Sequence, residues 1–143
     1  MDQETQAGLP SAANADDWGC DVPPFTESVD RMSRELIGYI ADRWTLLVFE
    51  ELAQGRPKRF GELRKALPGI SQKMLTQTLR QMESIGLVTR TIHPVIPPKV
   101  EYRRTELGRS LGPVICQLWT WVEENAAAME QARAAFAEAG AKT

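Results

Sequence analysis

The segment from Pro68 to Gly86, PGISQKMLTQTLRQMESIG, has the sequence of a helix with a marked beginning and a marked end. Pro68 and Gly69 favour a turn, and Ser71 is a good N-cap for the helix that follows. Gly86 suits the left-handed conformation that ends many helices, and the strand-forming sequence LVTRTI comes next. The rest of the chain is expected to be organised around this helix.

The two sides of this helix differ in chemistry. At about 100° per residue, Leu75, Leu79 and Met82 fall on one side. The opposite side offers amide, hydroxyl, ammonium and guanidinium groups, which suit the reading of base edges and phosphates. The residues predicted to read bases are Lys73, Thr76, Gln77, Arg80 and Ser84. The alternative is a solvated surface helix, so the flanking sequence has to decide.

Charge is distributed unevenly along the chain. The net charge is −2, but residues 56–109 contain twelve lysine and arginine residues and four carboxylates, for a local net charge of +8. The remaining residues therefore carry −10. A basic block between acidic ends is the electrostatic pattern of a nucleic-acid-binding surface. The alternative is a basic face that has no partner.

Three helices are predicted before the central one. Thr26 caps the first, over residues 27–40, and Asp42 caps the second, over residues 43–52. The third covers residues 60–67 and is short. A short helix, a tight turn with glycine and a second helix with a polar outer face form a helix-turn-helix pattern.

The apolar spacing changes after the central helix from helical to alternating. This change predicts a β-hairpin of two strands, over residues 87–93 and 99–104, joined by PVIPP. The prolines stiffen the loop, so the hairpin is expected to project as a wing that contacts the DNA backbone or minor groove. Val88 and Val100 are assigned to its buried side, and Arg90, Lys99 and Arg103 to its open side.

Further contacts to phosphate are predicted from the basic loop before the third helix and from the start of the central helix. Together with the wing, the predicted phosphate contacts are Arg56, Lys58, Arg59, Ser71, Gln72, Arg90, His93, Lys99 and Arg103.

The last helical region begins after Thr105 and extends to about residue 139. Pro113 lies inside it and is expected to kink or divide it. The apolar residues that follow cover more than one face, which exceeds what one small domain can bury. A second subunit is expected to cover them, and the alternative is packing against the first helix. The predicted dimer interface consists of Val29, Met32, Leu36, Leu118, Trp119, Trp121 and Val122.

Length and composition are those of one soluble globular domain. We expect a mainly α-helical (α+β) fold with a small β-hairpin over residues 25–125, an N-terminal tail over 1–24 and a helical extension over 126–143. No apolar run approaches a membrane span, and the acidic N-terminus lacks the features of a secretory signal. Two cysteines provide neither a disulfide framework nor a metal cluster. A cytoplasmic protein without cofactor or metal is therefore predicted.

Three segments of the chain resemble the HxlR-type winged helix-turn-helix regulators, which are relatives of the MarR type. They are DRWTLLVFEEL, RFGELRKALPGISQKMLTQTLRQMESIGLVTR and PPKVEYRRTELGRSL. The resemblance covers roughly residues 30–122. It implies a homodimer formed by the N- and C-terminal helices, and a repressor or activator that binds a pseudo-palindromic operator in double-stranded DNA.

Two positions depart from the family pattern. Several members carry a sensing cysteine shortly before the tryptophan that matches Trp44, whereas the matching positions around Arg31 hold none. Cys20, further upstream, is the candidate redox sensor, and an incidental free cysteine is the alternative. Arg104 replaces an apolar residue of the family, and it either extends along the face of the hairpin that carries Tyr102 or joins the DNA-facing charge.

A small-molecule effector is the remaining expected partner. The space between the first helix and the helix over residues 113–122 is its predicted site, with Ile40, Cys116 and Trp119 among the walls. The alternative is that core side chains fill this space.

Two other classes of function are alternatives to a DNA-binding regulator. An enzyme has little support, because His93 has no nearby carboxylate or cysteine in the sequence and no phosphate loop or nucleophile motif is present. No catalytic residue is therefore predicted. A winged-helix module used only for protein contacts is the remaining alternative, and the basic block argues against it.

Overall fold

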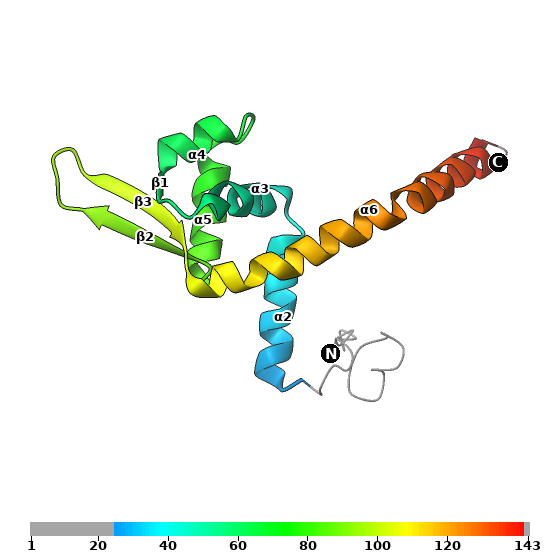
Figure 1. The fold of residues 1–143 in the computed structure, drawn as a ribbon, viewed down its shortest axis with the longest axis horizontal. Helices are drawn as coiled ribbons and strands as arrows, with labels where there is room; N and C mark the ends of the chain where they lie inside the picture. The colour runs from blue at the N-terminus through cyan, green and yellow to red at the C-terminus, as the bar shows by residue number, and fades with distance from the viewer. Residues whose placement is uncertain (1–24, 142–143) are drawn as a thin grey trace, which may run out of the picture.

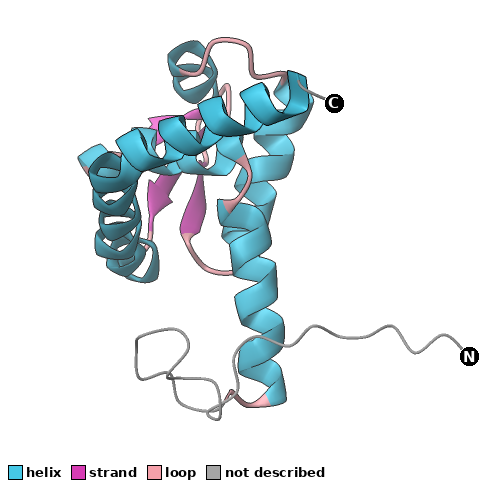
Figure 2. Cartoon of the chain, turned by 90° about the vertical axis from the view of Figure 1, so that its right-hand side faces the viewer, coloured by secondary structure: helices cyan, strands magenta, loops and turns pink. Residues whose placement is uncertain are grey.

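A helical core carries a small antiparallel sheet in the computed structural model, which describes residues 25–141 (Figures 1 and 2). The predicted tail over residues 1–24 and Cys20 within it lie outside the described residues. The elements are α2 Glu27–Ile40, α3 Arg43–Glu51, the short 3₁₀ helix η2 Leu52–Gln54, β1 Lys58–Arg59, α4 Phe60–Ala66, α5 Gln72–Ser84, β2 Val88–His93, β3 Lys99–Arg104 and α6 Glu106–Ala141.

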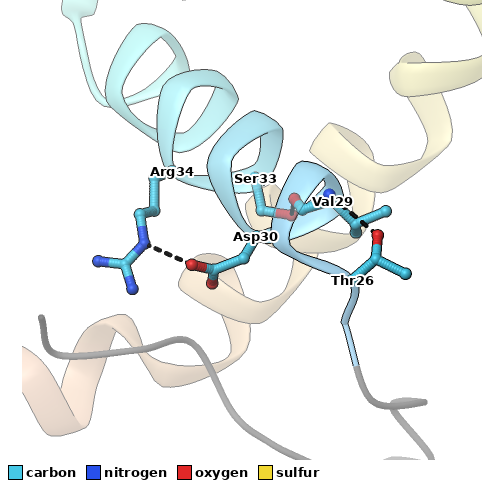
Figure 3. A network of polar contacts seen from close by, with 5 residues as sticks. All are labelled: Thr26, Val29, Asp30, Ser33 and Arg34. Carbon is cyan, nitrogen blue, oxygen red and sulfur yellow. Dashed lines mark hydrogen bonds and ion pairs between the residues drawn. The ribbon is translucent and has the colours of Figure 1, made fainter.

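The predicted N-caps are present. The side chain of Thr26 accepts a hydrogen bond from the backbone N–H of Val29 at the start of α2 (Figure 3). One turn later, an ion pair of 3.0 Å joins the Nε of Arg34 to Asp30. Asp42 caps α3 in the same way, and Ser71 accepts from the N–H of Met74 at 3.0 Å to begin α5. Each cap satisfies an N–H that the helix itself leaves unpaired.

The core lies between α3, α4, α5 and the base of the hairpin. Leu75, Leu79 and Met82 of α5 are fully buried there, as the sequence predicted. Thr78 is buried as well, which the sequence did not predict. The buried apolar residues are Val48, Phe49, Leu52, Leu63, Leu67, Ile70, Leu75, Leu79, Met82, Leu87, Val88 and Ile115.

Both ends of α5 depend on glycines in the left-handed conformation. Gly69 has φ +91° in the turn between α4 and α5, and Gly86 has φ +79° just after α5. After α5 the N–H of Leu87 donates to the carbonyl of Met82 at 2.9 Å, and the N–H of Gly86 donates to Glu83 at 3.1 Å. This pair of bonds is a Schellman motif, which needs a residue with positive φ at Gly86.

The wing is part of a three-stranded sheet with the order β1-β3-β2. β2 and β3 form the predicted hairpin, which projects from the helical core (Figure 1). The loop that the sequence assigned to residues 56–59 contains a strand instead, because Lys58 pairs with Tyr102 and Arg59 with Glu101. A two-residue strand is too short to leave an alternating pattern in the sequence.

The long helix α6 extends away from the core to the C-terminus (Figure 1). It runs without a break through Pro113, so the predicted division of this region is wrong, and it also passes through residue 125. Among the described residues, α2 contains no buried residue and α6 buries only Gly108 and Ile115. Two helices of this chain are thus largely uncovered.

We predict that Gly108→Ala lowers the stability of the fold, by about 1–3 kcal/mol. The first turn of α6 lies against the end of α5, and a Cβ at position 108 would overlap the carbonyl oxygen of Leu87. Thermal unfolding followed by circular dichroism measures the effect. Gly61→Ala in α4 is the matched control, because nothing lies within 4 Å of a Cβ there. Equal unfolding temperatures for Gly108→Ala and the unmodified chain would contradict this account.

Candidate nucleic-acid interface

The outward side of α5 forms a shallow groove of about 650 Å³. Four of the five residues predicted to read bases lie in it, and two further glutamines join them. The lining residues are Gln72, Lys73, Thr76, Gln77, Arg80 and Gln81. Gln81 is absent from the predicted set, although its position four residues after Gln77 places it on the same side of the helix.

Lys73 and Arg80 carry the positive charge of the groove. Both side chains are exposed, and neither has a carboxylate within salt-bridge distance among the described residues. Two uncompensated cations beside three amide side chains can bind phosphate oxygens and donate to or accept from base edges.

Ser84 does not belong to this groove. Its hydroxyl donates to the carbonyl of Gln81 at 2.7 Å, and the residue lines a different cavity near α2. Ser84 lies on the same side of the helix as Arg80, but about one turn further on, where α2 and α6 approach α5. The position of Ser84 therefore does not support its predicted contact with a base.

Lys58 is buried, which contradicts its predicted role at a phosphate. Its side chain is 7% exposed, and its ammonium donates to the carboxylate of Glu51 at 2.8 Å. Strand pairing with β3 turns this side chain inward, whereas the neighbouring Arg59 remains exposed. Arg56 is exposed and lies 3.1 Å from Glu62, while Ser71 and Gln72 are exposed at the start of α5.

The strand register divides the cations of the wing between its two faces. Successive side chains of a strand alternate, so Arg90 shares a face with Val88, and the prediction that it lies opposite Val88 is wrong. Arg90 lies 3.7 Å from Glu83 at the end of α5. On the other face, Glu101 lies 2.6 Å from Lys99 and 3.5 Å from His93.

The charge on the outer face of the wing is partly compensated as a result. The hydrogen bond from Lys99 holds the pKa of the Glu101 carboxyl below its ordinary value. Arg103, on the same face, is exposed and has no ion-pair partner in the described part of the chain. Arg103 is therefore the cation of the hairpin that is exposed and has no carboxylate partner among the described residues.

Arg104 belongs to the core side of the wing. It donates to the backbone carbonyl of Ala53 at 3.1 Å, and its guanidinium lies 4.8 Å from the centre of the Phe49 ring. Burial lowers the pKa of Arg104 from its ordinary value. These contacts support the first of the two predicted alternatives, in which Arg104 extends along the hairpin face instead of joining the charge that faces DNA.

A second cavity, of about 570 Å³, lies where α2, the end of α5 and the first turns of α6 meet. Its lining is mainly apolar and consists of Met32, Glu35, Leu36, Ser84, Ile85, Leu87, Leu107, Ser110 and Leu111. None of Ile40, Cys116 and Trp119, the predicted effector contacts, lines it. The helix α6 leaves the core after Ile115, so Cys116 and Trp119 are exposed.

No group of three or more His, Cys, Asp or Glu side chains within residues 25–141 is arranged to hold a metal ion. Over the same residues, no helix is both long enough and apolar enough to cross a bilayer.

Comparison with known proteins places the chain in a family. Residues 39–130 match the HxlR-like helix-turn-helix family. An uncharacterised HTH-type transcriptional regulator of Bacillus subtilis, YkvN, is 48% identical over 90 residues, which cover 63% of this chain and 73% of YkvN.

Two solved structures resemble the fold. The reduced form of the transcriptional regulator YodB from Bacillus subtilis is 32% identical, with a TM-score of 0.60 over 70% of this chain and 93% of YodB. The reduced form of the redox regulator HypR is 40% identical, with a TM-score of 0.60 over 67% of this chain and 94% of HypR. The chain belongs to the HxlR-like helix-turn-helix family and is a DNA-binding transcriptional regulator.

Proposed function

We propose that this regulator binds a pseudo-palindromic operator as a homodimer, with the two copies of α5 in successive major grooves about 34 Å apart. The observation that carries the proposal is the groove of α5, where Lys73 and Arg80 stand uncompensated beside Gln72, Gln77 and Gln81. Bidentate amide and guanidinium contacts to base edges are the usual means of direct readout. Repression and activation are both compatible with this geometry.

The exposed apolar surface of α2 and α6 supports the homodimer. Met32 is 58% exposed and Trp121 is 54% exposed, although side chains of this size are normally buried or covered by a partner. Val29, Leu118, Trp119 and Val122 are exposed as well, and Leu36 is half-buried. A two-fold pairing of these helices would remove this surface from water and give the two recognition helices the symmetry of the operator.

We further propose that a small molecule regulates binding from the cavity between α2, α5 and α6. The end of α5 forms one wall through Ser84 and Ile85, and α6 forms another through Leu107 and Leu111. An occupant would bias the angle between the recognition helix and the proposed dimer helices. Redox control through Cys20 is the alternative, and the similarity to HypR, which is described as a redox regulator, supports testing it.

The regulator is proposed to act in the cytoplasm as a binding protein without catalytic activity. The family and the named relatives are transcriptional regulators, which work on DNA and need no chemistry of their own. His93, the one histidine of the chain, lies beside Glu101 on the hairpin, and it lines neither the α5 groove nor the cavity between α2, α5 and α6.

Gln77→Ala is expected to weaken operator binding by about 1–3 kcal/mol and to relax the preference at one base pair. The amide of Gln77 is exposed in the middle of the α5 groove, where it can pair with a base edge. Binding is measured by fluorescence anisotropy on the best duplex selected from a random library and on its single-base variants. Gln131→Ala, on the exposed end of α6, is the control. An equal loss on operator and scrambled duplex would reject base readout by Gln77.

Arg59→Ala is expected to lower the dependence of log Kobs on log salt concentration by about one unit, because one phosphate contact is lost. Lys58→Met is the matched comparison at the adjacent position, and it should leave the slope unchanged because Lys58 is buried against Glu51. Binding isotherms at several salt concentrations give both slopes. A lower slope for Lys58→Met, or an unchanged slope for Arg59→Ala, would contradict the assignment.

Leu118→Glu is expected to produce monomers and to weaken operator binding by at least about tenfold, because a carboxylate would be buried in the proposed α6 interface. Sedimentation velocity gives the oligomeric state and anisotropy gives the affinity. Gln117→Glu adds the same charge one position earlier on an exposed site and serves as the control. A Leu118→Glu chain that stays dimeric would exclude this helix from the interface.

A further inference from the structure

The tip of the wing exposes aliphatic side chains to water. Ile96 is 102% exposed, Val95 is 52% exposed, and Ile92 on β2 is 57% exposed. The tip sequence PVIPP contains no charged residue. An aliphatic cluster at the end of a projecting hairpin contributes nothing to the core, so its exposure points to contact with another molecule.

The proposed dimer does not account for this cluster. Every other large hydrophobic residue that is exposed within residues 25–141 lies on α2 or on α6. The hairpin projects from the core on the side away from the C-terminal end of α6 (Figure 1). The exposed apolar residues therefore form two separate sets, and only one of them lies on the helices proposed to pair.

The tip is held in place by its own backbone. Pro94, Pro97 and Pro98 have fixed φ angles, and the N–H of Val95 donates to the carbonyl of His93 at 2.8 Å. Ile96 is thus presented on a stiff loop that loses little conformational freedom on binding. The loop also borders a surface hollow of about 460 Å³ whose other wall is the start of α4, with Arg59.

The charges next to the tip favour a polyanion as the partner. Arg59, which has no ion-pair partner among the described residues, lies across the hollow, and Lys99 directly follows the tip, although Glu101 pairs with it. Arg103 is a further free cation at the base of the same hairpin. DNA-binding proteins that enter the minor groove combine such cations with an aliphatic wedge that partly unstacks a base step. A protein partner for the aliphatic tip would have to accommodate these cations as well.

We propose that Ile96 is an aliphatic wedge that enters the minor groove beside the site of α5 and partly opens one base step, with Val95 against the neighbouring sugars. The proposal rests on the placement of α5 in the major groove. It assigns to the wing tip a role in bending or opening the operator, in addition to the backbone contacts of its cations.

The test uses the full chain and the best duplex selected from a random library, with 2-aminopurine placed in turn at each base step that the wing protects from cleavage. Unstacking at one step should raise the 2-aminopurine fluorescence about twofold on binding of the unmodified chain and of Ile96→Met, which keeps an aliphatic wedge. Ile96→Ala should lose most of this rise and bind about tenfold more weakly. Gln131→Ala, at an exposed polar position on α6, is the control and should behave as the unmodified chain.

The possible outcomes distinguish a failure of the wedge from a failure of the proposed placement of α5 in the major groove. If the unmodified chain selects no preferred duplex, the placement of α5 fails, and the wedge fails with it. If the duplex is bound specifically but no step brightens, or Ile96→Ala matches the unmodified chain in both measurements, the wedge alone is wrong. If Ile96→Ala leaves DNA binding intact but changes the sedimentation coefficient of the free protein, the tip is a protein contact and the proposal is overturned.

Discussion

The burial of one side of α5 is the constraint on which the rest of the arrangement depends. Leu75, Leu79 and Met82 are at most 1% exposed, so the rotation of this helix about its axis is fixed by the core. A rotation that turned Lys73 or Arg80 into the apolar interior would bury an unpaired charge, and this would cost a large part of the free energy that stabilises a small domain. The same packing that holds the domain together therefore aims the polar side of α5 outward.

Ion pairs within the fold select which cations remain available to DNA. The sequence concentrates positive charge between residues 56 and 109, but carboxylates lie beside Lys58, Arg90 and Lys99. The exposed cations of this block that have no ion-pair partner among the described residues are Arg59, Arg64, Lys65, Lys73, Arg80, Arg103 and Arg109. The chain has an acidic isoelectric point, but most of its acidic residues lie outside residues 56–109. The few carboxylates within that block pair with particular cations, so the chain can still present a basic surface.

Local sequence signals predicted the elements well, whereas the roles of single residues depended on contacts between elements. The caps at Thr26 and Ser71 and the left-handed Gly86 are local features, and all three are present. The burial of Lys58 follows from a strand of two residues that pairs with β3 more than forty positions later. No local pattern in the sequence predicts this pairing. Ser84 lies on the same side of the helix as Arg80, so only the approach of α2 and α6 separates the two.

The apolar surface also explains why the two ends of the molecule can have different partners. The exposed apolar side chains on α2 and α6 are large and spread over two helices, so they offer a wider apolar surface than the wing tip does. The cluster at the wing tip is small, and the free cation Arg59 lies across the hollow beside it. In the proposed complex, the contacts of α5 would supply most of the affinity, and a single aliphatic side chain at the tip would add discrimination through the ease with which a base step opens.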